Sequence, residues 1–320
     1  MIRLFKYLAV VLSTFVAVLV GYMALHWEPD RSVEELAERW APEPSAFVGV
    51  DGMKVHYRDQ GPESPRRTLV LLHGTSASLH TWEGWAEALA DEYRVVSLDL
   101  PGFGLTGPFV EHDDYGMEAY VRFMKNALDA LEVNQAVVAG NSFGGEVAWE
   151  MALALPERVR GLVLVNAAGY PGEAESMPLG FRLASLPGME HIMNRVLPRE
   201  VIESSVRNVY GDPDQVSEGL VDRYFQLTLR KGNRQALRKR FAAPREHADT
   251  PERLAGIDQS TLVLWGDRDR LIPPENAQRF SEDIPAADMV MFEGLGHVPQ
   301  EEDPEATVAA LREFLEKLPD

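Results

Sequence analysis

One serine stands between glycines in a pattern that suits nucleophilic catalysis. Residues 140–145 have the sequence Gly-Asn-Ser-Phe-Gly-Gly, which places Ser142 at the centre of a Gly-x-Ser-x-Gly pattern. A short apolar run, residues 136–139, precedes it, and a helical pattern follows. Small residues permit the sharp strand-to-helix turn that projects such a serine from a sheet edge. Ser142 is therefore predicted to be a nucleophile.

A serine hydroxyl needs a base to take its proton and a carboxylate to orient that base. His297 follows Gly294-Leu295-Gly296, directly after an apolar run near the C-terminus. Asp267 and Asp269 follow another apolar run at residues 261–265. The order serine, acid, histidine is that of one known type of triad. His297 is predicted to be the base, with either aspartate as the acid.

Backbone amides near the serine could stabilise a developing oxyanion. Residues 73–76, His-Gly-Thr-Ser, end an apolar run, and the N–H groups of Thr75 and Phe143 are the expected donors. We expect His73 to brace loops rather than to react. Asp99 precedes the nucleophile in the chain, so it is predicted to support the scaffold.

Apolar runs alternate with helical patterns from residue 46 onward, which predicts an α/β fold with a mostly parallel sheet. Asp51-Gly52 suits a hairpin turn between two leading antiparallel strands. We expect helices over residues 115–131 and 146–155. The expected strands are residues 46–50, 53–58, 68–72, 94–98, 136–139, 161–165, 261–265 and 289–292.

Residues 170–250 break this alternation, because they contain no clear strand pattern and several amphipathic helical patterns. We expect a helical cap inserted into a core formed by residues 46–169 and 251–320. The apolar residues of the cap either line a substrate pocket or pack on the core. They include Met177, Leu179, Phe181, Leu186, Met189, Ile192 and Met193.

The amino-terminal residues form a separate unit. Residues 7–25 carry no charge, and Arg3 and Lys6 precede them. This length suits a membrane anchor, assigned to residues 1–27, with a cytoplasmic N-terminus and an exported catalytic domain. Secretion after signal cleavage is the alternative. Residues 28–45 are predicted to be a spacer that contains a short helix with a capping box, Ser32 to Glu35.

Composition excludes several classes of function. The 320 residues carry a formal net charge of −19, which argues against binding to nucleic acid. The absence of cysteine removes disulfides, thiolate catalysis and thiolate zinc sites. Nothing in the sequence predicts an oligomeric state.

Together these motifs resemble those of the α/β-hydrolase superfamily, in the group with a helical cap after the sixth strand. The resemblance covers roughly residues 46–318 and implies an eight-stranded sheet flanked by helices. It also implies that the acid is Asp269, four residues before Pro273, with Asp267 as the fallback. Some relatives carry the acid after the sixth strand, where this chain has Asn166.

The resemblance implies a serine hydrolase that cleaves a carboxylic ester through an acyl-enzyme and needs no metal or organic cofactor. The apolar N-terminal segment and the methionine-bearing cap predict that this ester is lipophilic. A serine at residue 142 argues against dehalogenases and epoxide hydrolases, which use aspartate there. The Gly-Asn-Ser-x-Gly-Gly turn is also similar to C–C bond hydrolases of aromatic catabolism, but residues 76–78 are Ser-Ala-Ser where those carry Gly-Pro-Gly. C–C hydrolysis, a perhydrolase side activity and a non-catalytic binding protein on this fold are the alternatives.

Overall fold

The computed structural model describes residues 2–171, 174–186, 188, 190–244 and 249–319. An eight-stranded sheet forms its centre, with the strand order β1-β2-β4-β3-β5-β6-β7-β8. Every predicted strand is present, so the α/β class is confirmed. The strands are β1 (Ser45–Val50), β2 (Met53–Gln60), β3 (Thr68–Leu72), β4 (Arg94–Leu98), β5 (Ala136–Asn141), β6 (Val159–Val165), β7 (Thr261–Gly266) and β8 (Ala287–Phe292).

The first two strands form the predicted antiparallel hairpin. Val50 pairs with Met53 across Asp51 and Gly52, whose φ angles are 46° and 72°. Two positive φ angles fit a type I′ turn, which matches the twist of the flanking strands. Strand β2 also runs antiparallel to β4, and all the other pairs are parallel.

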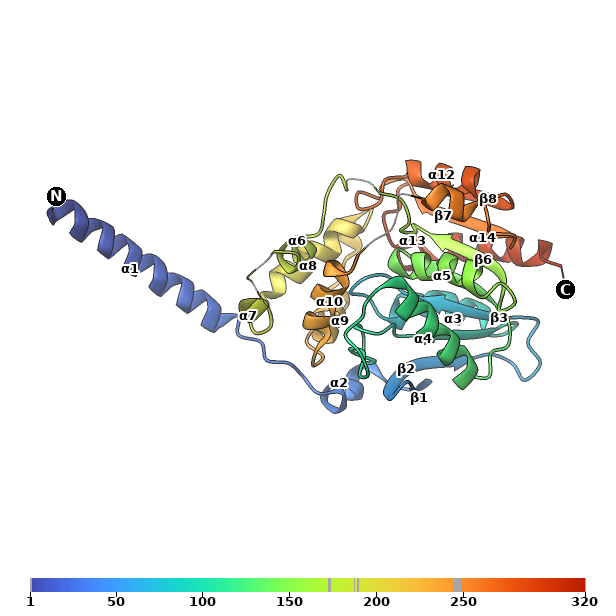
Figure 1. The fold of residues 1–320 in the computed structure, drawn as a ribbon, viewed down its shortest axis with the longest axis horizontal. Helices are drawn as coiled ribbons and strands as arrows, with labels where there is room; N and C mark the ends of the chain where they lie inside the picture. The colour runs from blue at the N-terminus through green and yellow to red at the C-terminus, as the bar shows by residue number, and fades with distance from the viewer. Residues whose placement is uncertain (1, 172–173, 187, 189, 245–248, 320) are drawn as a thin grey trace.

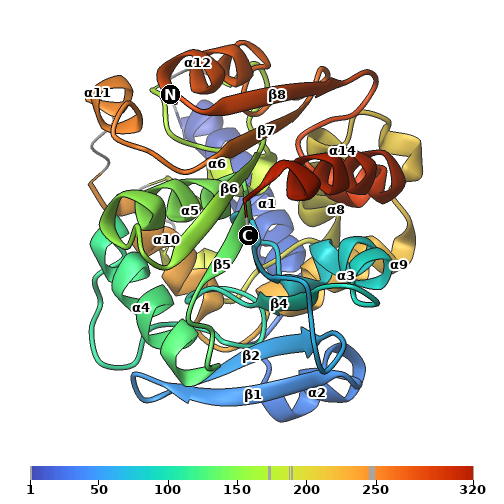
Figure 2. The ribbon, with the colours of Figure 1, turned by 90° about the vertical axis from the view of Figure 1, so that its right-hand side faces the viewer.

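Helices cover both faces of the sheet (Figure 2). Apolar contacts join α4 (Met117–Ala130), α5 (Phe143–Ala154) and α12 (Glu275–Asp283) to one face. On the other face α3 (Glu83–Leu89) and α14 (Pro304–Lys317) pack in the same way. Because both faces are covered, the central strands are continuous apolar runs rather than alternating patterns.

Two predicted helix boundaries differ from the structure. Helix α5 begins at Phe143, directly after the serine, and not at residue 146, because the strand turns into the helix with no intervening loop. Helix α4 begins at Met117 rather than residue 115, since Gly116 is its N-cap with extended backbone angles.

Helices alone connect β6 to β7 in the part of the chain that the structure describes, as expected for residues 170–250. In Figure 1 they lie at one end of the sheet, between the core and α1. Helix α13 (Pro299–Glu302) belongs to the core. The helices of this insertion are α6 (Leu179–Ala184), α7 (Glu190–Met193), α8 (Arg199–Val209), the 3₁₀ helix η2 (Pro213–Gln215), α9 (Glu218–Thr228) and α10 (Asn233–Ala242). Helix α11 (Thr250–Leu254) follows them and contacts α12 of the core, and its Leu254 is buried in the core cluster.

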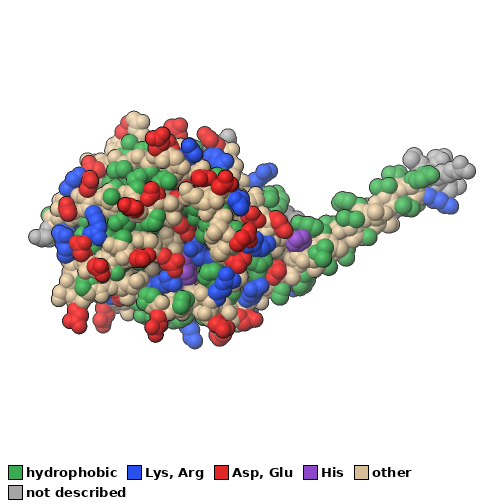
Figure 3. Space-filling view, turned by 180° about the vertical axis from the view of Figure 1, so that it is seen from behind, with side chains coloured by type: hydrophobic (Ala, Val, Ile, Leu, Met, Phe, Trp, Pro, Cys, Tyr) green, Lys and Arg blue, Asp and Glu red, His purple; other side chains and the backbone are tan. Residues whose placement is uncertain are grey.

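Helix α1 (Ile2–Leu25) projects from the body as a stalk covered with apolar side chains (Figures 1 and 3). Its stretch Phe5–Leu25 has a mean hydropathy of 2.4, and none of the residues in its most apolar window is buried. Its length and composition are sufficient to span a membrane, and a signal sequence would meet the same test.

The residues after α1 are paired with the insertion. Trp27 forms an isolated antiparallel bridge with Val196, and Arg31 forms a parallel bridge with Arg230. Four backbone hydrogen bonds accompany these bridges: Glu28 N to Arg195 O, Leu197 N to His26 O, Arg31 N to Leu229 O and Lys231 N to Arg31 O, at 2.7–3.0 Å.

Helix α2 (Val33–Trp40) begins with the predicted capping box, in which Glu35 N donates to Ser32 Oγ at 3.2 Å and Ser32 N donates to Glu35 Oε2 at 2.8 Å. Its Leu36 is buried in a cluster with Leu105 and Leu227. The segment that was expected to be a spacer is therefore part of the packed body.

We predict that deleting residues 1–25 changes the melting temperature by less than about 2 °C, whereas deleting residues 1–31 lowers it by about 5 °C or more. The shorter deletion removes no buried side chain among the residues whose exposure is described, but the longer one also removes backbone hydrogen bonds worth about 1 kcal/mol each. Thermal unfolding of both proteins and the full chain in the same neutral detergent tests this. Equal melting temperatures for the two deletions would show that the bridges add no stability.

Candidate active site

Ser142 lies at the turn between β5 and α5, as the sequence predicted. Its backbone angles, φ 55° and ψ −119°, are unusual for a residue with a side chain. Its N–H donates to Val165 O at 3.0 Å, and its carbonyl accepts from Ala168 N at 3.0 Å. These bonds from the end of β6 and the residues that follow it hold the strained turn in place.

A glycine after the serine is required by close packing. A Cβ atom built on Gly144 would lie 2.2 Å from Leu72 O, at the end of the neighbouring strand β3. Real Cβ atoms do not approach a carbonyl oxygen so closely, so a side chain here would push β3 and α5 apart. The glycines of the pattern thus serve geometry, as expected.

His297 and Asp269 are brought together although 28 residues separate them. His297 Nδ1 lies 2.7 Å from Asp269 Oδ2, and both side chains are buried. An ionised carboxylate has no proton to donate, so His297 Nδ1 carries the proton of this hydrogen bond. His297 Nε2 is then free to act as a base. Asp267 instead accepts from Gly294 N at 2.7 Å, which leaves Asp269 as the partner of the histidine.

Asp269 is held by donors on both of its oxygens. Oδ1 accepts from the N–H groups of Leu271 and Ile272 at 2.8 and 3.0 Å, and Oδ2 also accepts from Asn166 Nδ2 at 2.7 Å. These donors fix the orientation of the carboxylate. Asn166 stands at the alternative acid position, and its role as a donor to Asp269 was not predicted from the sequence.

A second asparagine positions the histidine loop. Asn141, next to the nucleophile, donates through Nδ2 to His297 O at 2.9 Å and to Val165 O at 3.1 Å. It therefore links the serine turn, the end of β6 and the histidine loop. Its place inside the Gly-Asn-Ser motif was the only signal in the sequence for this role.

The predicted oxyanion donors lie at the ends of β3 and β5. Thr75 lines the same cavity as Ser142 and His297. Phe143 is the first residue of α5, whose N-terminus has no side-chain cap, so its N–H is one of the unpaired donors typical of a helix start. Its side chain is buried and packs on Tyr120, with ring centroids 4.8 Å apart, so only its backbone could serve the site.

His73 and Asp99 both have structural partners. Leu100 N donates to His73 Nε2 at 3.0 Å, so Nδ1 carries the proton and donates to Gly74 O at 2.7 Å. Burial lowers the pKa of His73 and keeps the ring neutral. Burial by itself would raise the pKa of Asp99, but the charge and hydrogen bond of His56 outweigh it and hold that pKa below its usual value.

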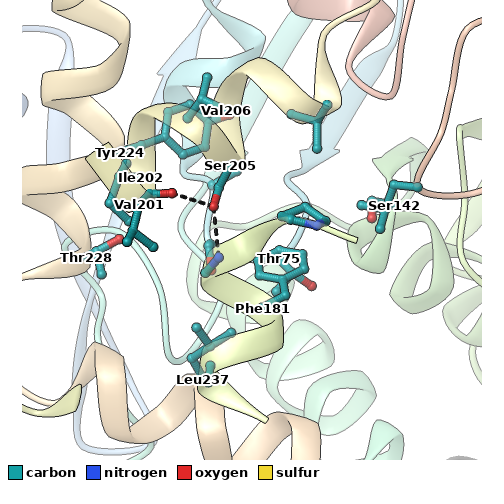
Figure 4. Close-up of a pocket in the computed structure, with 18 of the residues that line it drawn as sticks. Thr75, Ser142, Phe181, Val201, Ile202, Ser205, Val206, Tyr224, Thr228 and Leu237 are labelled. Carbon is teal, nitrogen blue, oxygen red and sulfur yellow. Dashed lines mark hydrogen bonds between the residues drawn. The ribbon is translucent and has the colours of Figure 1, made fainter. Parts of the chain in front are cut away.

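Ser142 and His297 open into one mostly apolar cavity with about 1000 Å³ of empty space, including its mouth. Figure 4 shows Ser142 at one side of it and Phe181, Val206, Tyr224 and Leu237 around it. No hydrogen bond joins Ser142 Oγ to the His297 ring within the described part of the chain; such contacts are often long before substrate binds. The described residues contain no group of three or more metal-ligating side chains.

The apolar cap residues singled out in the sequence divide into two sets. Phe181 and Met193 line the cavity. Met177, Leu179, Leu186 and Ile192 are exposed instead. Met189 lies outside the described residues.

Comparison with known sequences identifies the family. The sequence matches the α/β-hydrolase fold family over residues 67–304. The chain belongs to that family. The hydrolase is 30% identical to the uncharacterised hydrolase YugF of Bacillus subtilis over 270 residues, covering 83% of this chain and 96% of YugF. It is also 30% identical to 2-hydroxy-6-oxo-2,4-heptadienoate hydrolase of Pseudomonas putida over 281 residues, covering 84% of this chain and 95% of that one.

Among solved structures, the hydrolase is similar to one described as a membrane phospholipase A and bacterial virulence factor. The two share 26% sequence identity with a TM-score of 0.70, and the match covers 99% of each chain. Since 99% coverage leaves out only a few residues, the likeness extends into the α1 segment as well as the catalytic body.

Glu302 ties the histidine loop of the hydrolase to the insertion. Its carboxylate accepts from Gly296 N at 2.9 Å and from Gly211 N, just after α8, at 2.7 Å. A Cβ atom on Gly211 would lie 2.2 Å from Gly294 O, so the two loops are in direct contact. Burial raises the pKa of Glu302 to about 7, although the two N–H donors lower it in part. No motif in the sequence pointed to this residue.

We predict that Glu302→Gln removes a pH dependence of stability. Because the folded-state pKa of Glu302, about 7, exceeds its usual 4.5, the folded state binds more protons between these values and loses stability as pH rises through them. From pH 5 to pH 8 the wild type should lose on the order of 2 kcal/mol relative to the variant. Urea unfolding at pH 5, 6, 7 and 8 measures this difference, and a constant difference across that range would contradict it.

Proposed function

We propose that this α/β hydrolase cleaves a lipophilic carboxylic ester through an acyl-enzyme intermediate. The observation that carries the proposal is the 2.7 Å hydrogen bond between His297 and Asp269 at the wall of the apolar cavity that Ser142 also lines. Ser142 is the nucleophile, His297 the base and Asp269 the acid that orients it. The N–H groups of Thr75 and Phe143 are the oxyanion donors.

The chemistry takes place in two steps. His297 Nε2 takes the Ser142 proton as Oγ attacks the ester carbonyl, and then gives that proton to the departing alcohol. Water, activated by the same nitrogen, attacks the acyl-enzyme and releases the acid. Asp269 stays ionised and stabilises the imidazolium, and the apolar cavity accepts the acyl chain.

Two comparisons bear on the bond that is cleaved. The phospholipase structure matches nearly the whole chain, including the α1 segment, and phospholipases of this name act on esters. The 2-hydroxy-6-oxo-2,4-heptadienoate hydrolase of Pseudomonas putida matches 84% of the chain, and it favours C–C cleavage as the second candidate. Residues 76–78, Ser-Ala-Ser, lack the Gly-Pro-Gly of the C–C group. Ester cleavage is therefore the first proposal.

A membrane location follows from the amino-terminal segment. Helix α1 is apolar, exposed and long enough to span a bilayer. Arg3 and Lys6 before it favour a cytoplasmic N-terminus and an exported catalytic domain. Residues 26–31 are paired with the insertion, which keeps the insertion close to the end of α1. The proposed division of the chain is an anchor at residues 1–27, a cap at residues 170–250, and a core formed by residues 46–169 and 251–320.

We predict that the full chain hydrolyses p-nitrophenyl esters and prefers medium or long acyl chains. Ser142→Ala and Asp269→Asn should each lower kcat on the order of 10⁴-fold, because each removes one member of a cooperating triad. A series from acetate to palmitate measures this. Ser185→Ala, which changes an exposed serine of the insertion, is the matched control and should keep full activity.

A covalent fluorophosphonate probe separates the alternatives. Labelling that requires Ser142, without turnover of any ester in the series, would shift the proposal to C–C hydrolysis. A folded protein that neither reacts with the probe nor turns over an ester would instead be a binding protein on this fold. Ester turnover that survives Ser142→Ala would rule out the mechanism.

We predict that a cysteine placed at the exposed Ser64 reacts with a membrane-impermeant maleimide in intact cells, whereas one placed at Ile2, before the apolar stretch Phe5–Leu25, reacts only after lysis. The chain has no other cysteine, so each label reports one site. The opposite pattern would reverse the topology. Release of the labelled protein from membranes at high pH would favour signal cleavage.

A further inference from the structure

Two arginines of α10 face the apolar cavity of the hydrolase. Arg234 and Arg238 are four residues apart, which places them on the same face of the helix, and both line the cavity that Ser142 and His297 line. Cations are unusual in the wall of an acyl pocket, because burying a charge is unfavourable unless a partner compensates it.

Neither guanidinium has its full set of partners. The Nε and Nη1 atoms of Arg234 and of Arg238 are all buried and have no hydrogen-bond partner in the described part of the chain. The side chain of Arg234 is only 6% exposed; its Nη2 donates to Glu28 O at 2.9 Å and to Asp30 Oδ1 at 2.6 Å. No ion pair or hydrogen bond of Arg238 is found among the described residues.

The other basic residues nearby are compensated. Arg240 donates to Glu146 Oε2 at 3.2 Å, and its guanidinium lies 4.2 Å from the Phe143 ring centroid. Lys239 pairs with Asp113 at 2.5 Å, away from the cavity. Arg240 Nε is also buried without a partner, but the other four unpartnered N–H groups described on α10 belong to Arg234 and Arg238, which line the cavity.

We propose that Arg234 and Arg238 form a subsite for an anionic oxygen group, phosphate or carboxylate, carried by an otherwise apolar ligand. A guanidinium offers paired N–H donors that match the two oxygens of such a group. In each arginine Nη2, not Nη1, lies on the same edge of the guanidinium as Nε, so the unpartnered Nε–H and Nη1–H groups point in different directions and each can donate to an oxygen of the ligand. The apolar lining takes the chain, and the arginines take the charged group.

The net charge of −19 makes this local arrangement informative. The protein as a whole repels anions, so the buried Arg234 and the partly buried Arg238 in the cavity wall select for an anion at a single place. Asp30 leaves Arg234 partly neutralised, whereas Arg238 keeps its full charge for the ligand. Since Asp30 follows the α1 segment, the chain leaving the anchor also fixes one of the two arginines.

This subsite deepens the proposed ester hydrolysis by naming an anionic amphiphile as the substrate class. A phosphate would come from a lipid headgroup and a carboxylate from an organic acid. The binding test below needs no turnover, so a failure of ester hydrolysis would not affect its result.

Isothermal titration of the full chain in neutral detergent tests the subsite, with Ser142→Ala as the background. The ligands are octyl phosphate, octanoate and octanol, which share one chain length. Comparing protein variants with the same ligand removes the effect of partition into micelles. Lys239→Met is the matched control, because it removes a positive charge from the same helix outside the cavity.

Arg238→Met should weaken binding of octyl phosphate, octanoate or both by at least about ten-fold, and Lys239→Met should leave it within about two-fold. Octanol should bind both variants alike. A loss confined to octyl phosphate identifies a headgroup phosphate, and a loss confined to octanoate identifies a carboxylate. An equal loss for octanol, or no loss for either anion in Arg238→Met and Arg234→Met, would overturn the proposal.

Discussion

Ser142 occupies a backbone conformation that costs about 1–3 kcal/mol for a residue with a side chain. The turn persists because backbone hydrogen bonds hold it. The N–H of Ser142 donates to the carbonyl of Val165, the last residue of β6, and its carbonyl accepts from the N–H of Ala168, just after that strand. Close approach of Gly144 to β3 leaves no room for relaxation. The same turn directs the hydroxyl into the cavity and begins α5 immediately afterwards, so its unpaired N–H groups lie beside the serine.

The histidine loop depends on contacts from several directions. Asn141 binds the carbonyl of His297 from the nucleophile side, and Asp269 binds its ring. Val209 O accepts the His297 N–H from the end of α8, and Glu302 bridges Gly296 to the residues after α8. The insertion between β6 and β7 is thus a support for the predicted base as well as a wall of the cavity.

The segment after α1 extends this connection toward the membrane. Its backbone pairs with the insertion at Val196 and Arg230, and its Asp30 holds Arg234 at the cavity wall. The residues after α1, the insertion and the cavity wall are therefore joined by direct contacts. In the proposed membrane arrangement a substrate leaving the bilayer would meet the insertion first, because in Figure 1 the insertion lies between α1 and the sheet.

The sequence by itself determined the strands, the hairpin at Asp51-Gly52, the serine turn and the family, since each depends on residues close together in the chain. It also narrowed the acid to two aspartates. Only the tertiary structure decided that Asp269 binds His297, that Asn166 and Glu302 support that pair, and that residues 28–45 pack on the body. It alone placed Arg234 and Arg238 in the cavity wall. These contacts join segments far apart in the chain, and their partners are chosen by how the elements pack, which leaves no local pattern to read.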